Sequence, residues 1–411
     1  MQNKPSPNFN PILVYLAVIL LVLNAVFLGF LLFGKSKPVI PTKIATQNIV
    51  TAEIHNPTPQ PTDITPPATI TAPIRLAWFT SLPKQTEDLL TVANWFDVFF
   101  LIRGDEDTRD LIKSLGAEGP ILQYVEFESI QDPGSCSEEP KVNQAASQPG
   151  DFCFISNQHP DWFLLDREGQ RIVTTDQGNT WYLMDPGNQG WRNFFLERIR
   201  KFQSDPNWDG VFLDNVPISL AFREDEGSLP FAYPDDANYR GAIQGFLEFL
   251  HREYFEPNNK LLFANLTARR DDAGWIASLN FIDGAMYEGW AIDWPNGYRP
   301  AEVWERHLDL AEQTQLAGKY IILVSLGNRD DEALQKFAFA SYLLINHGNA
   351  AFRYSNSNFY RETWLYDDYA IQLGNPINLR YKDGAVWRRD FENGSVSVDP
   401  MSHEVKIIIK P

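Results

Sequence analysis

Carboxylate side chains follow apolar runs at several places in this sequence. The segment WDGVFLDN passes through an uncharged run before it reaches Asp214, and the segment DGAMYEGW reaches Glu288 in the same way. Other acids near the ends of apolar runs are Glu126, Glu128 and Asp185. An apolar run of this length predicts a buried strand. Two carboxyl groups that meet at strand ends can share acid–base work, one as proton donor and the other as nucleophile or base.

Each of these acids also has a structural interpretation. Asp214 could cap the helix that follows it, which is a common role of aspartate. Asp185, in MDPGN, has the chemistry of a helix N-cap followed by proline, and it could line a site as well. Glu288 has no evident capping role. Because side chains alternate along a strand, only one of Glu126 and Glu128 can point inward. We therefore predict Asp214 and Glu288 as the catalytic pair.

The neighbours of the two acids predict different roles for them. Asp214 is followed by Asn215, and a polar setting suits a carboxylate that stays ionised as nucleophile or base. Glu288 lies beside Tyr287 and close to Trp290. An apolar, aromatic wall disfavours the charged form and raises a carboxyl pKa, which suits a proton donor. The opposite assignment stays open at this point.

Aromatic and polar side chains gather near the same strand ends. Sugar rings present apolar C–H faces that can stack on aromatic rings, and their hydroxyls need polar partners. The alternative is that these rings are ordinary core and rim residues, because large rings dominate protein cores. The group at 287–298 favours a binding role. The candidate substrate-binding residues are Asp185, Asn215, Trp78, Arg103, Tyr182, Asn265, Tyr287, Trp290 and Trp294, with Trp181 and Tyr298 as further aromatics of the same kind.

Eight short apolar segments alternate with amphipathic helical patterns. Apolar residues recur at three- and four-residue intervals in 191–204, and similar patterns occupy 241–254, 301–316 and 331–345. Repeated strand–helix alternation predicts an α/β fold of the (β/α)8 TIM-barrel type. A doubly wound sheet is the rival, but no glycine-rich phosphate loop follows the first strand. The predicted strands are 75–80, 96–102, 121–127, 209–215, 261–266, 283–289, 320–327 and 349–355.

Two segments interrupt or extend this alternation within 74–411. The interval between the third and fourth strands is far longer than a usual connection, and we predict an insertion at 128–181 with a hairpin at 162–173. After the eighth strand, 380–411 contains GAVWRRDFENGSVSVDP, which alternates around an Asn-Gly turn and predicts a small C-terminal β hairpin. In a TIM barrel the loops at the C-terminal strand ends surround the active site, so the insertion should wall it.

The N-terminal part of the chain has a different composition. After a short tail at 1–10, residues 11–34 carry no charge. As a helix, the apolar stretch 11–33 within it would be roughly 34 Å long, enough to cross a bilayer core of about 30 Å. A cleaved signal peptide is the alternative, but its apolar region should be only about 7–15 residues long. Residues 35–73 are rich in Pro, Thr, Ile and Ala, which predicts an extended linker without a core.

A linker between a membrane anchor and a globular domain favours export of that domain from the cytoplasm. One lysine precedes the apolar run and three follow soon after it, which by itself opposes this orientation. Cys136 and Cys153 lie in one polar segment, and in an exported protein they could form a local disulfide. As free thiols they would carry no such meaning. We expect a single-pass membrane protein with an extracytoplasmic domain.

Charge and composition narrow the class of partner. The formal net charge is −18 at pH 7, which argues against nucleic acid, because that partner requires a basic surface. The six histidines are scattered and do not form a cluster with the two cysteines. We therefore expect no metal and no cofactor, and we expect a monomer.

Four segments of the chain together resemble a known protein family. HPDWFLLDREGQRI, YLMDPGNQGWRNFF, WDGVFLDN and VWRRDFENGSVSVDP resemble the hypothetical TIM-barrel glycoside hydrolases, which are distantly similar to endo-α-1,4-polygalactosaminidases. The resemblance spans most of 75–400. It implies a (β/α)8 fold and retained carboxylates at Asp214 and Glu288, and it implies no particular substrate. The anchor and linker are not part of the family pattern.

We therefore expect a membrane-anchored glycoside hydrolase that cleaves a polysaccharide or oligosaccharide by a two-carboxylate mechanism. The alternative is a non-catalytic carbohydrate-binding barrel on the cell surface, and a third possibility is a structural envelope protein that kept only the barrel. Carboxyl groups facing each other at about 5–9.5 Å permit catalysis. An acid in a structural ion pair, or at the base of the barrel, would favour binding.

Overall fold

The computed structural model describes residues 72–176, 178–267 and 272–410. The tail predicted at 1–10, the anchor at 11–34 and nearly all of the linker at 35–73 lie outside the described residues. Within the described residues, no helix combines the length and apolar character needed to cross a bilayer.

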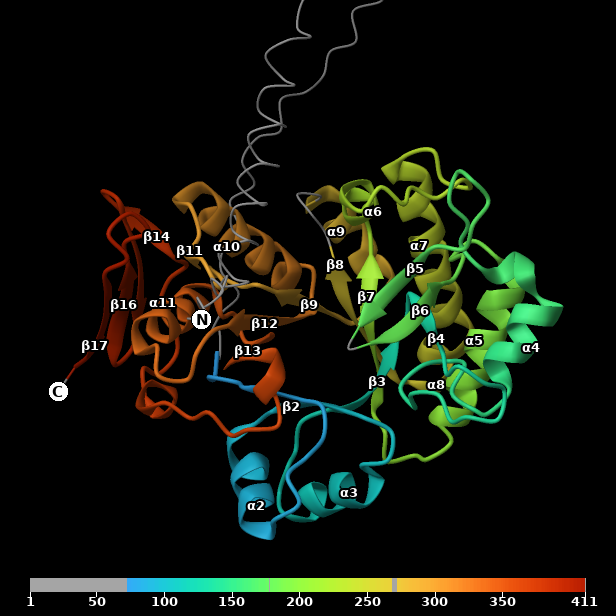
Figure 1. The fold of residues 1–411 in the computed structure, drawn as a ribbon. Coiled ribbons are helices and arrows are strands. Elements are labelled where there is room, and N and C mark those ends of the chain that lie inside the picture. The colour runs from blue at the N-terminus through green and yellow to red at the C-terminus, as the bar shows by residue number, and fades with distance from the viewer. Residues whose placement is uncertain (1–71, 177, 268–271, 411) are drawn as a thin grey trace, which may run out of the picture. The chain divides into compact units, whose positions relative to one another are not determined.

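Eight parallel strands form a barrel at the centre of the domain (Figure 1). Each of the eight strands pairs with the barrel strand that follows it in the sequence, and a parallel bridge between Leu76 and Phe352 joins the first strand to the last. All eight predicted strands are confirmed, and this topology is that of a TIM barrel. The strands are β1 (Ala77–Phe79), β2 (Val98–Leu101), β3 (Ile121–Glu126), β7 (Gly210–Pro217), β8 (Leu261–Thr267), β9 (Gly284–Glu288), β12 (Tyr320–Leu326) and β13 (Ala350–Ser355).

Alternate residues of each strand point to opposite sides of the barrel wall. In β1, Ala77 and Phe79 pack in the barrel interior, whereas Trp78 packs in the layer between strands and helices. Burial on both sides explains why the strand sequences are nearly continuous apolar runs. The interior is filled by Ala77, Phe79, Val98, Phe100, Leu122, Phe212, Phe263, Met286, Ile322, Val324 and Ala351.

Helices cover the outside of the barrel (Figure 1). Asn188, Asp235 and Asp331 cap three of them, each accepting a backbone N–H from the residue three positions on. After β13 the described chain makes two 3-10 turns, Ser357–Phe359 and Asp367–Ala370, where an eighth helix would follow in a regular barrel. The outer helices are α2 (Thr86–Trp95), α3 (Glu106–Ser114), α5 (Gln189–Phe202), α7 (Asp236–Leu250), α9 (Asp272–Ser278), α10 (Ala301–Leu316) and α11 (Glu332–Ile345), and shorter pieces are α6 (Ala221–Asp225) and α8 (Glu256–Asn258).

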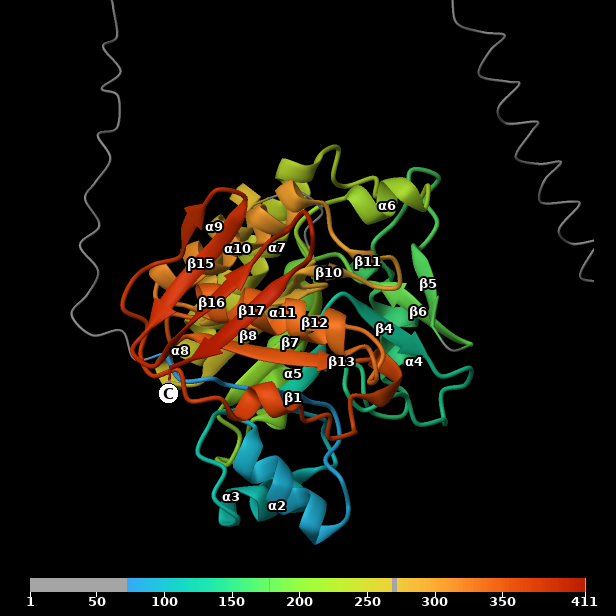
Figure 2. The same cartoon turned by 90° about the vertical axis from the view of Figure 1, so that its left-hand side faces the viewer.

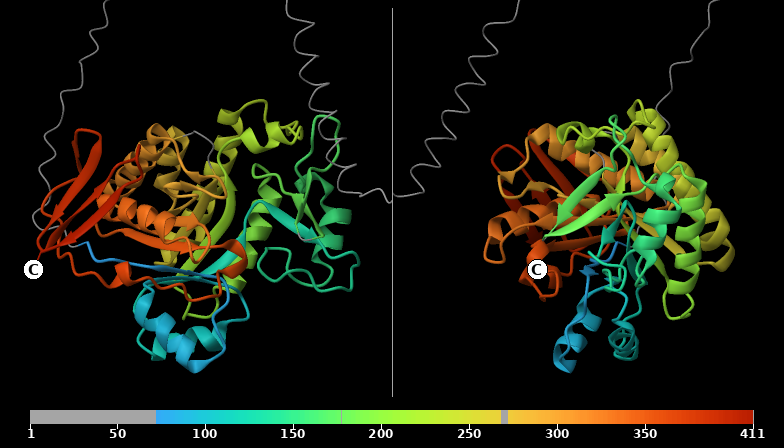
Figure 3. Two further views of the ribbon diagram at one scale, coloured as in Figure 1. Left: turned by 60° about the vertical axis from the view of Figure 1, so that its left-hand side comes forward. Right: turned by 45° about the vertical axis from the view of Figure 1, so that its right-hand side comes forward.

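The chain between β3 and α5 forms a separate layer on one side of the barrel. It holds a three-stranded sheet in the order β4 (Ser129–Asp132), β6 (Asn179–Leu183), β5 (Val173–Asp176), together with helix α4 (Asp151–Gln158). The predicted hairpin at 162–173 is present as a turn closed by an antiparallel bridge between Leu165 and Arg171. Figure 3 shows this insertion and the C-terminal sheet at opposite sides of the barrel.

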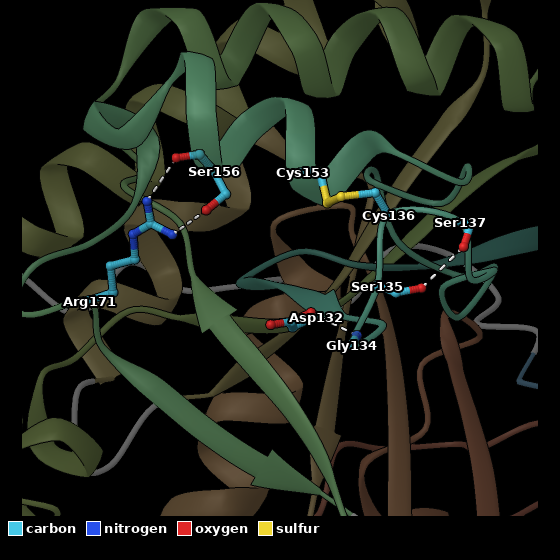
Figure 4. The surroundings of a disulfide bond; sticks show 8 residues. All are labelled: Asp132, Gly134, Ser135, Cys136, Ser137, Cys153, Ser156 and Arg171. Carbon is cyan, nitrogen blue, oxygen red and sulfur yellow. Dashed lines mark hydrogen bonds between the residues drawn. A yellow bond between two sulfur atoms is a disulfide. The ribbon is translucent and has the colours of Figure 1, made fainter.

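A disulfide joins Cys136, in the loop after β4, to Cys153 in α4 (Figure 4). Their Cα atoms are 5.6 Å apart. On the same helix, Ser156 accepts a hydrogen bond from Nη1 of Arg171 at its hydroxyl (2.7 Å) and another from Nη2 at its carbonyl (3.0 Å). Within the insertion, α4 is therefore held by one covalent and one polar attachment, as Figure 4 shows.

The C-terminal segment is larger than predicted. In place of a single hairpin it forms a four-stranded antiparallel sheet, which faces the viewer in Figure 2. The hairpin predicted at 384–400 supplies the two central strands, and the sheet packs against α11. The two outer strands are too short or too exposed to show a buried period in the sequence. The strands are β14 (Tyr381–Asp383), β15 (Val386–Phe391), β16 (Gly394–Val398) and β17 (Val405–Ile409).

Three aspartates sit at the opposite end of the barrel from the acids described below. Asp97, Asp209 and Asp283 each directly precede or adjoin the start of a barrel strand, in the related segments FDVFF, WDGVF and IDGAM. Each accepts a backbone N–H at the start of the preceding strand, namely Leu76 (2.9 Å), Ile121 (2.8 Å) and Leu262 (2.9 Å). These aspartates satisfy strand-end donors that would otherwise lack a partner, so their role is structural.

Candidate active site

Asp214 and Glu288 meet at the C-terminal end of the barrel through a shared donor. Asp214 is the fifth residue of β7, which continues to Pro217, and it pairs with Glu126 at the end of β3, whereas Glu288 is the last residue of β9. Asn265, on the intervening strand β8, points its side-chain amide between them. Its Nδ2 donates to Oδ1 of Asp214 at 2.9 Å and lies 3.4 Å from Oε2 of Glu288. Three adjacent strands therefore bring the predicted pair and the predicted Asn265 into one cluster.

Two tyrosine hydroxyls complete the contacts of this pair. Tyr124, on β3, donates to Oδ2 of Asp214 at 2.5 Å. Tyr360, in the loop after β13, donates to Oε1 of Glu288 at 3.3 Å. Each carboxylate of the pair thus receives one tyrosine hydroxyl as well as the Asn265 amide. The shorter bonds are those to Asp214, so its position is the more firmly determined.

A local irregularity in β7 presents both Asp214 and Asn215 at the mouth. The pairing of β7 with β8 shifts register between Leu213 and Val216, and Asn215 has a left-handed backbone with φ of 54°. Asparagine tolerates this conformation better than most residues, and bulges commonly re-aim side chains beside active sites. The Asn215 side chain turns toward β3, where its Nδ2 donates to Oε2 of Glu126 at 2.8 Å.

Burial and mutual repulsion raise the pKa of two carboxyl groups here. The pKa of Glu288 is raised above its ordinary value mainly by burial of its carboxyl group and then by the charge of Asp214, while the bonds from Asn265 and Tyr360 oppose the rise. Part of the Glu288 side chain remains exposed at the mouth, so solvent moderates this effect. The pKa of Glu126, which is 9% exposed, is raised well above its ordinary value by burial and by the charge of Asp214. Both shifts favour the protonated form of these two carboxyl groups.

Two other acids named from the sequence lie in separate contacts. Glu128 forms an ion pair with Arg223 of α6 at 3.3 Å, and burial raises its pKa to about 7 against the opposing effect of Arg223. Asp185 accepts a hydrogen bond from the Tyr233 hydroxyl and another from the backbone N–H of Gly187. Of the two interpretations of Asp185, the helix cap is wrong, because the cap of α5 is Asn188; substrate binding by Asp185 stays a prediction.

The sequence profile of hypothetical glycosyl hydrolase family 15 matches residues 121–395. The chain belongs to this family. The matched range begins with β3 and ends in β16, so it contains every residue of the cluster around Asp214 and Glu288. Membership in hypothetical glycosyl hydrolase family 15 confirms the resemblance to TIM-barrel glycoside hydrolases and supports glycoside hydrolase activity. Among curated proteins, no sequence matches this chain.

Several solved glycoside hydrolases are similar to this member of hypothetical glycosyl hydrolase family 15. The glycoside hydrolase domain of PelA from Pseudomonas aeruginosa is 16% identical, with a TM-score of 0.46 over 71% of this chain and 97% of that domain. The α-galactosidase TtGalA from Thermus thermophilus is 15% identical, with a TM-score of 0.43 over 81% of this chain and 67% of that one. The maltogenic α-amylase AmyB from Thermotoga neapolitana is 11% identical, with a TM-score of 0.44 over 79% and 86%. Such distant likeness carries no information on substrate.

Several aromatics predicted to bind substrate are packed inside the domain. Trp78 and Trp290 are 0% exposed, so neither has surface available to a ligand. Trp78 meets Phe96 edge to face, and the Trp290 Nε1 donates to the carbonyl of Ala338 at 3.2 Å. Tyr287 points outward from the barrel and its hydroxyl bonds to Nε2 of His307 at 2.7 Å. Strand alternation explains these positions, since Trp78 and Tyr287 belong to the helix-facing side of the wall.

The remaining predicted contacts are distributed over other surfaces. Arg103 places its guanidinium 4.4 Å from the ring centre of Phe202 at the end of α5. Tyr182 belongs to β6 and packs against Phe152 in the insertion, with ring centres 5.3 Å apart. Trp294 is 38% exposed, in the ribbon of β10 (Ile292–Asp293) and β11 (Gly297–Tyr298) that follows β9. Of these three, only Trp294 presents a ring to solvent on a loop that follows a strand of the pair.

Tyr124 and Tyr360 were not predicted from the sequence. Tyr124 could have been found, because it lies two residues before Glu126 and therefore on the same face of the same strand. Tyr360 follows the last barrel strand in a segment without a periodic pattern, and only the folded chain brings it to Glu288. Among the described residues, no group of three or more His, Cys, Asp or Glu is arranged to hold a metal ion.

Proposed function

We propose that this chain hydrolyses glycosidic bonds in a polysaccharide, with Asp214 and Glu288 as the catalytic pair. The observation that carries the proposal is the shared contact of both carboxyl groups with Asn265, 2.9 Å from Asp214 and 3.4 Å from Glu288. Both acids face the mouth formed by the C-terminal strand ends, which is where TIM-barrel enzymes hold their active sites. Membership in a glycosyl hydrolase family supports the same reaction class.

The spacing of the pair favours retention of anomeric configuration. Since the Asn265 Nδ2 contacts both groups, Oδ1 of Asp214 and Oε2 of Glu288 are no more than about 6.3 Å apart. This bound lies below the about 6.5–9.5 Å of inverting enzymes and includes the roughly 5–5.5 Å of retaining enzymes. A short spacing leaves no room for a water between the second acid and the sugar. We therefore infer a covalent intermediate rather than direct attack by water.

The different surroundings of the two acids assign their roles. Asp214 receives the two shorter hydrogen bonds, from Tyr124 and Asn265, and attacks the anomeric carbon as a carboxylate. Glu288, whose pKa is raised by burial and by Asp214, donates its proton to the leaving glycosidic oxygen. The ionised Glu288 then takes a proton from water, which attacks the same carbon and releases Asp214.

The predicted anchor and linker support a location for the enzyme at the outer face of a membrane. Residues 11–34 are long and uncharged, and 35–73 form a Pro/Thr-rich segment, which together favour a monomeric enzyme tethered to a membrane with its barrel outside the cytoplasm. The disulfide between Cys136 and Cys153 supports an oxidising compartment. Protease added to intact cells should degrade the barrel. Full protection until lysis would contradict this orientation.

A non-catalytic carbohydrate-binding barrel is the second candidate, and hydrolysis distinguishes the two. The full chain is incubated with a panel of bacterial and plant polysaccharides, and new reducing ends are measured. Binding without any new reducing ends over the whole panel would favour the second candidate.

Matched variants then test the pair on the polysaccharide that is hydrolysed. We expect Asp214→Asn and Glu288→Gln each to lower turnover about 10²- to 10⁴-fold, because each removes one acid–base function. The controls are Asp209→Asn and Asp283→Asn, which change an acid at the other end of the same two strands. Near-normal turnover in either of the first two variants would remove that residue from the mechanism. The first product should have the anomeric configuration of the substrate by NMR.

A further inference from the structure

Arg353 is a buried arginine behind the active site that no catalytic step uses. It lies in β13 and is 2% exposed. Its Nη2 donates to the backbone carbonyls of Tyr360 at 3.1 Å and Glu362 at 2.9 Å. Both carbonyls belong to the loop that leaves β13, so a single nitrogen holds two points of this loop.

No acid neutralises this arginine within the described part of the chain. Its Nε and Nη1 have no hydrogen-bond partner among the residues that the structure describes, and its Nη2 bonds go to backbone carbonyls. The guanidinium carbon lies 5.1 Å from the ring centres of both Trp78 and Phe96, an arrangement in which an aromatic face stabilises a cation. Burial lowers the Arg353 pKa to about 10, so it stays charged at neutral pH. A buried charge without an acid partner is costly to stability, so its presence calls for another role.

The loop that Arg353 holds carries a group of the active site. The Tyr360 hydroxyl donates to Oε1 of Glu288 at 3.3 Å. The Tyr360 ring lies over the top of the barrel interior, with its centre 5.5 Å from that of Phe79. The backbone of Tyr360 is thus held by Arg353 while its side chain reaches Glu288. Displacing the loop would separate the hydroxyl from the carboxylate without changing either residue.

We propose that Arg353 is a positioning residue for catalysis, which holds the loop carbonyls of Tyr360 and Glu362 so that the Tyr360 hydroxyl stays on Glu288. This inference rests on the proposed role of Glu288 as the proton donor. Trp78 and Phe96 are the aromatic platform on which the guanidinium lies, which gives Trp78 a supporting place in the site without any contact with substrate.

The proposal predicts the direction of a pH effect. The groups that face Glu288 are Asp214 from β7, Asn265 from β8 and Tyr360 from the loop, and its neighbour in β12 is the apolar Val324. A hydrogen bond donated to a carboxylate favours its ionised form. Loss of the Tyr360 bond therefore raises the Glu288 pKa. Because a proton donor must be protonated, the basic limb of the kcat/KM profile moves to higher pH.

The test compares the basic limbs of Tyr360→Phe, Arg353→Met and the double variant. We expect the first two to move the limb upward by up to about one pH unit, in keeping with a long hydrogen bond. The double variant should move it no further than Tyr360→Phe alone, because both changes remove the same contact. Arg353→Lys keeps a cation that can reach the carbonyls, so it should restore part of the profile.

The chain offers a matched control in Arg389. It is also buried, at 0% exposed, and its Nη1 also donates to backbone carbonyls, those of Leu343, Leu344 and Asn346. It belongs to the C-terminal sheet rather than to the barrel mouth. Arg389→Met should lower the melting temperature and leave the pH profile unchanged. A profile for Arg353→Met that matches Arg389→Met would overturn the proposal, as would an extra shift in the double variant.

A second measurement separates this inference from the proposed function. The Glu288 carboxyl is titrated by ¹³C NMR in the full chain with labelled glutamate, and Glu288→Gln assigns the signal. This readout requires no substrate. If no polysaccharide is hydrolysed but Arg353→Met raises the Glu288 pKa as Tyr360→Phe does, the proposed function fails and the positioning contact stands. An unchanged titration in Arg353→Met would overturn the positioning role whatever the substrate.

Discussion

The hydroxyl of Tyr124 lies 2.5 Å from Oδ2 of Asp214 on the neighbouring strand. Glu126 and Asp214 are Cα partners in the pairing of β3 with β7. Tyr124 lies two residues before Glu126, so it reaches Asp214 from deeper in the barrel. Burial and the charge of Asp214 raise the Tyr124 pKa well above its ordinary value. The hydroxyl therefore keeps its proton and acts as a fixed donor to the carboxylate.

Tyr124→Phe should lower kcat/KM about 10- to 100-fold, because a hydrogen bond to a charged group contributes about 1.5–3 kcal/mol. The substitution removes one oxygen and keeps the ring, so the fold should be retained. Tyr182→Phe is the matched control, since Tyr182 packs in the insertion away from the pair. Steady-state kinetics on the hydrolysed polysaccharide measure both variants. Equal kinetics for Tyr124→Phe and the wild type would show that the bond does not orient Asp214.

Glu126→Gln should make the protein more stable at pH 8 than the wild type, with little difference at pH 4. The folded-state pKa of Glu126 is raised by burial and by Asp214, so above about pH 4.3, the ordinary glutamate value, the unfolded chain loses a proton that the folded chain retains. Stability then falls as pH rises through the folded pKa. Glutamine keeps the shape and removes this penalty.

Urea unfolding at the two pH values measures the effect of Glu126→Gln. Glu197→Gln is the control, because Glu197 is exposed and pairs with Arg200 on the surface of α5. A loss of stability at pH 8 for Glu126→Gln would mean that the glutamate is held there as an ion.

Removal of the disulfide should loosen the insertion and leave the barrel folded. The bridge spans a sequence separation of 17 residues, and loop entropy for this length amounts to about 3 kcal/mol as an upper estimate. Because Arg171 still holds Ser156 of α4, the replacement of Cys136 and Cys153 by serine should act locally. Hydrogen exchange should quicken within the insertion and stay unchanged in the barrel strands. Reductant should reproduce this pattern in the wild type and have no effect on the variant.

Trp294→Ala and Trp290→Ala should have opposite profiles although the two residues are close in sequence. Trp294 is 38% exposed, and we expect its loss to raise KM severalfold if its ring stacks on a sugar, with an unchanged melting temperature. Trp290 is 0% exposed, and its removal should cost about 3–5 kcal/mol of unfolding free energy. Unchanged KM for Trp294→Ala would exclude this ring from the substrate path.

The sequence by itself determined the barrel and the candidate pair. Strands buried on both sides must be continuous apolar runs, and strand–helix alternation leaves few topologies other than a barrel. An acid at the end of such a run lies at the mouth by strand direction alone, which is why Asp214 and Glu288 could be named. The number and position of the cysteines also indicated a possible disulfide, because the chain has two cysteines and both lie in one segment.

Only the tertiary structure decided which side chains surround the pair. The two aspartates of WDGVFLDN look alike in the sequence, yet Asp209 holds a strand-end amide and Asp214 meets Glu288 through Asn265. The aromatics Trp78 and Trp290 were expected at the mouth and instead pack behind the wall. Tyr360 lies in the loop after β13, 72 positions from Glu288 in the sequence, and only the folded chain brings its hydroxyl to that carboxyl group.

The physical reason for this division is the range of the interactions. Burial periodicity is local, so it can be recognised within a few residues and it specifies which segments become strands and helices. The contacts of Asp214, Glu288 and Arg353 join residues that are distant in the sequence, and their partners depend on the closure of the barrel and on the direction of each loop. A side chain near a strand end can point to the mouth or to the helices with a change of one position in register, and only the folded chain makes that choice.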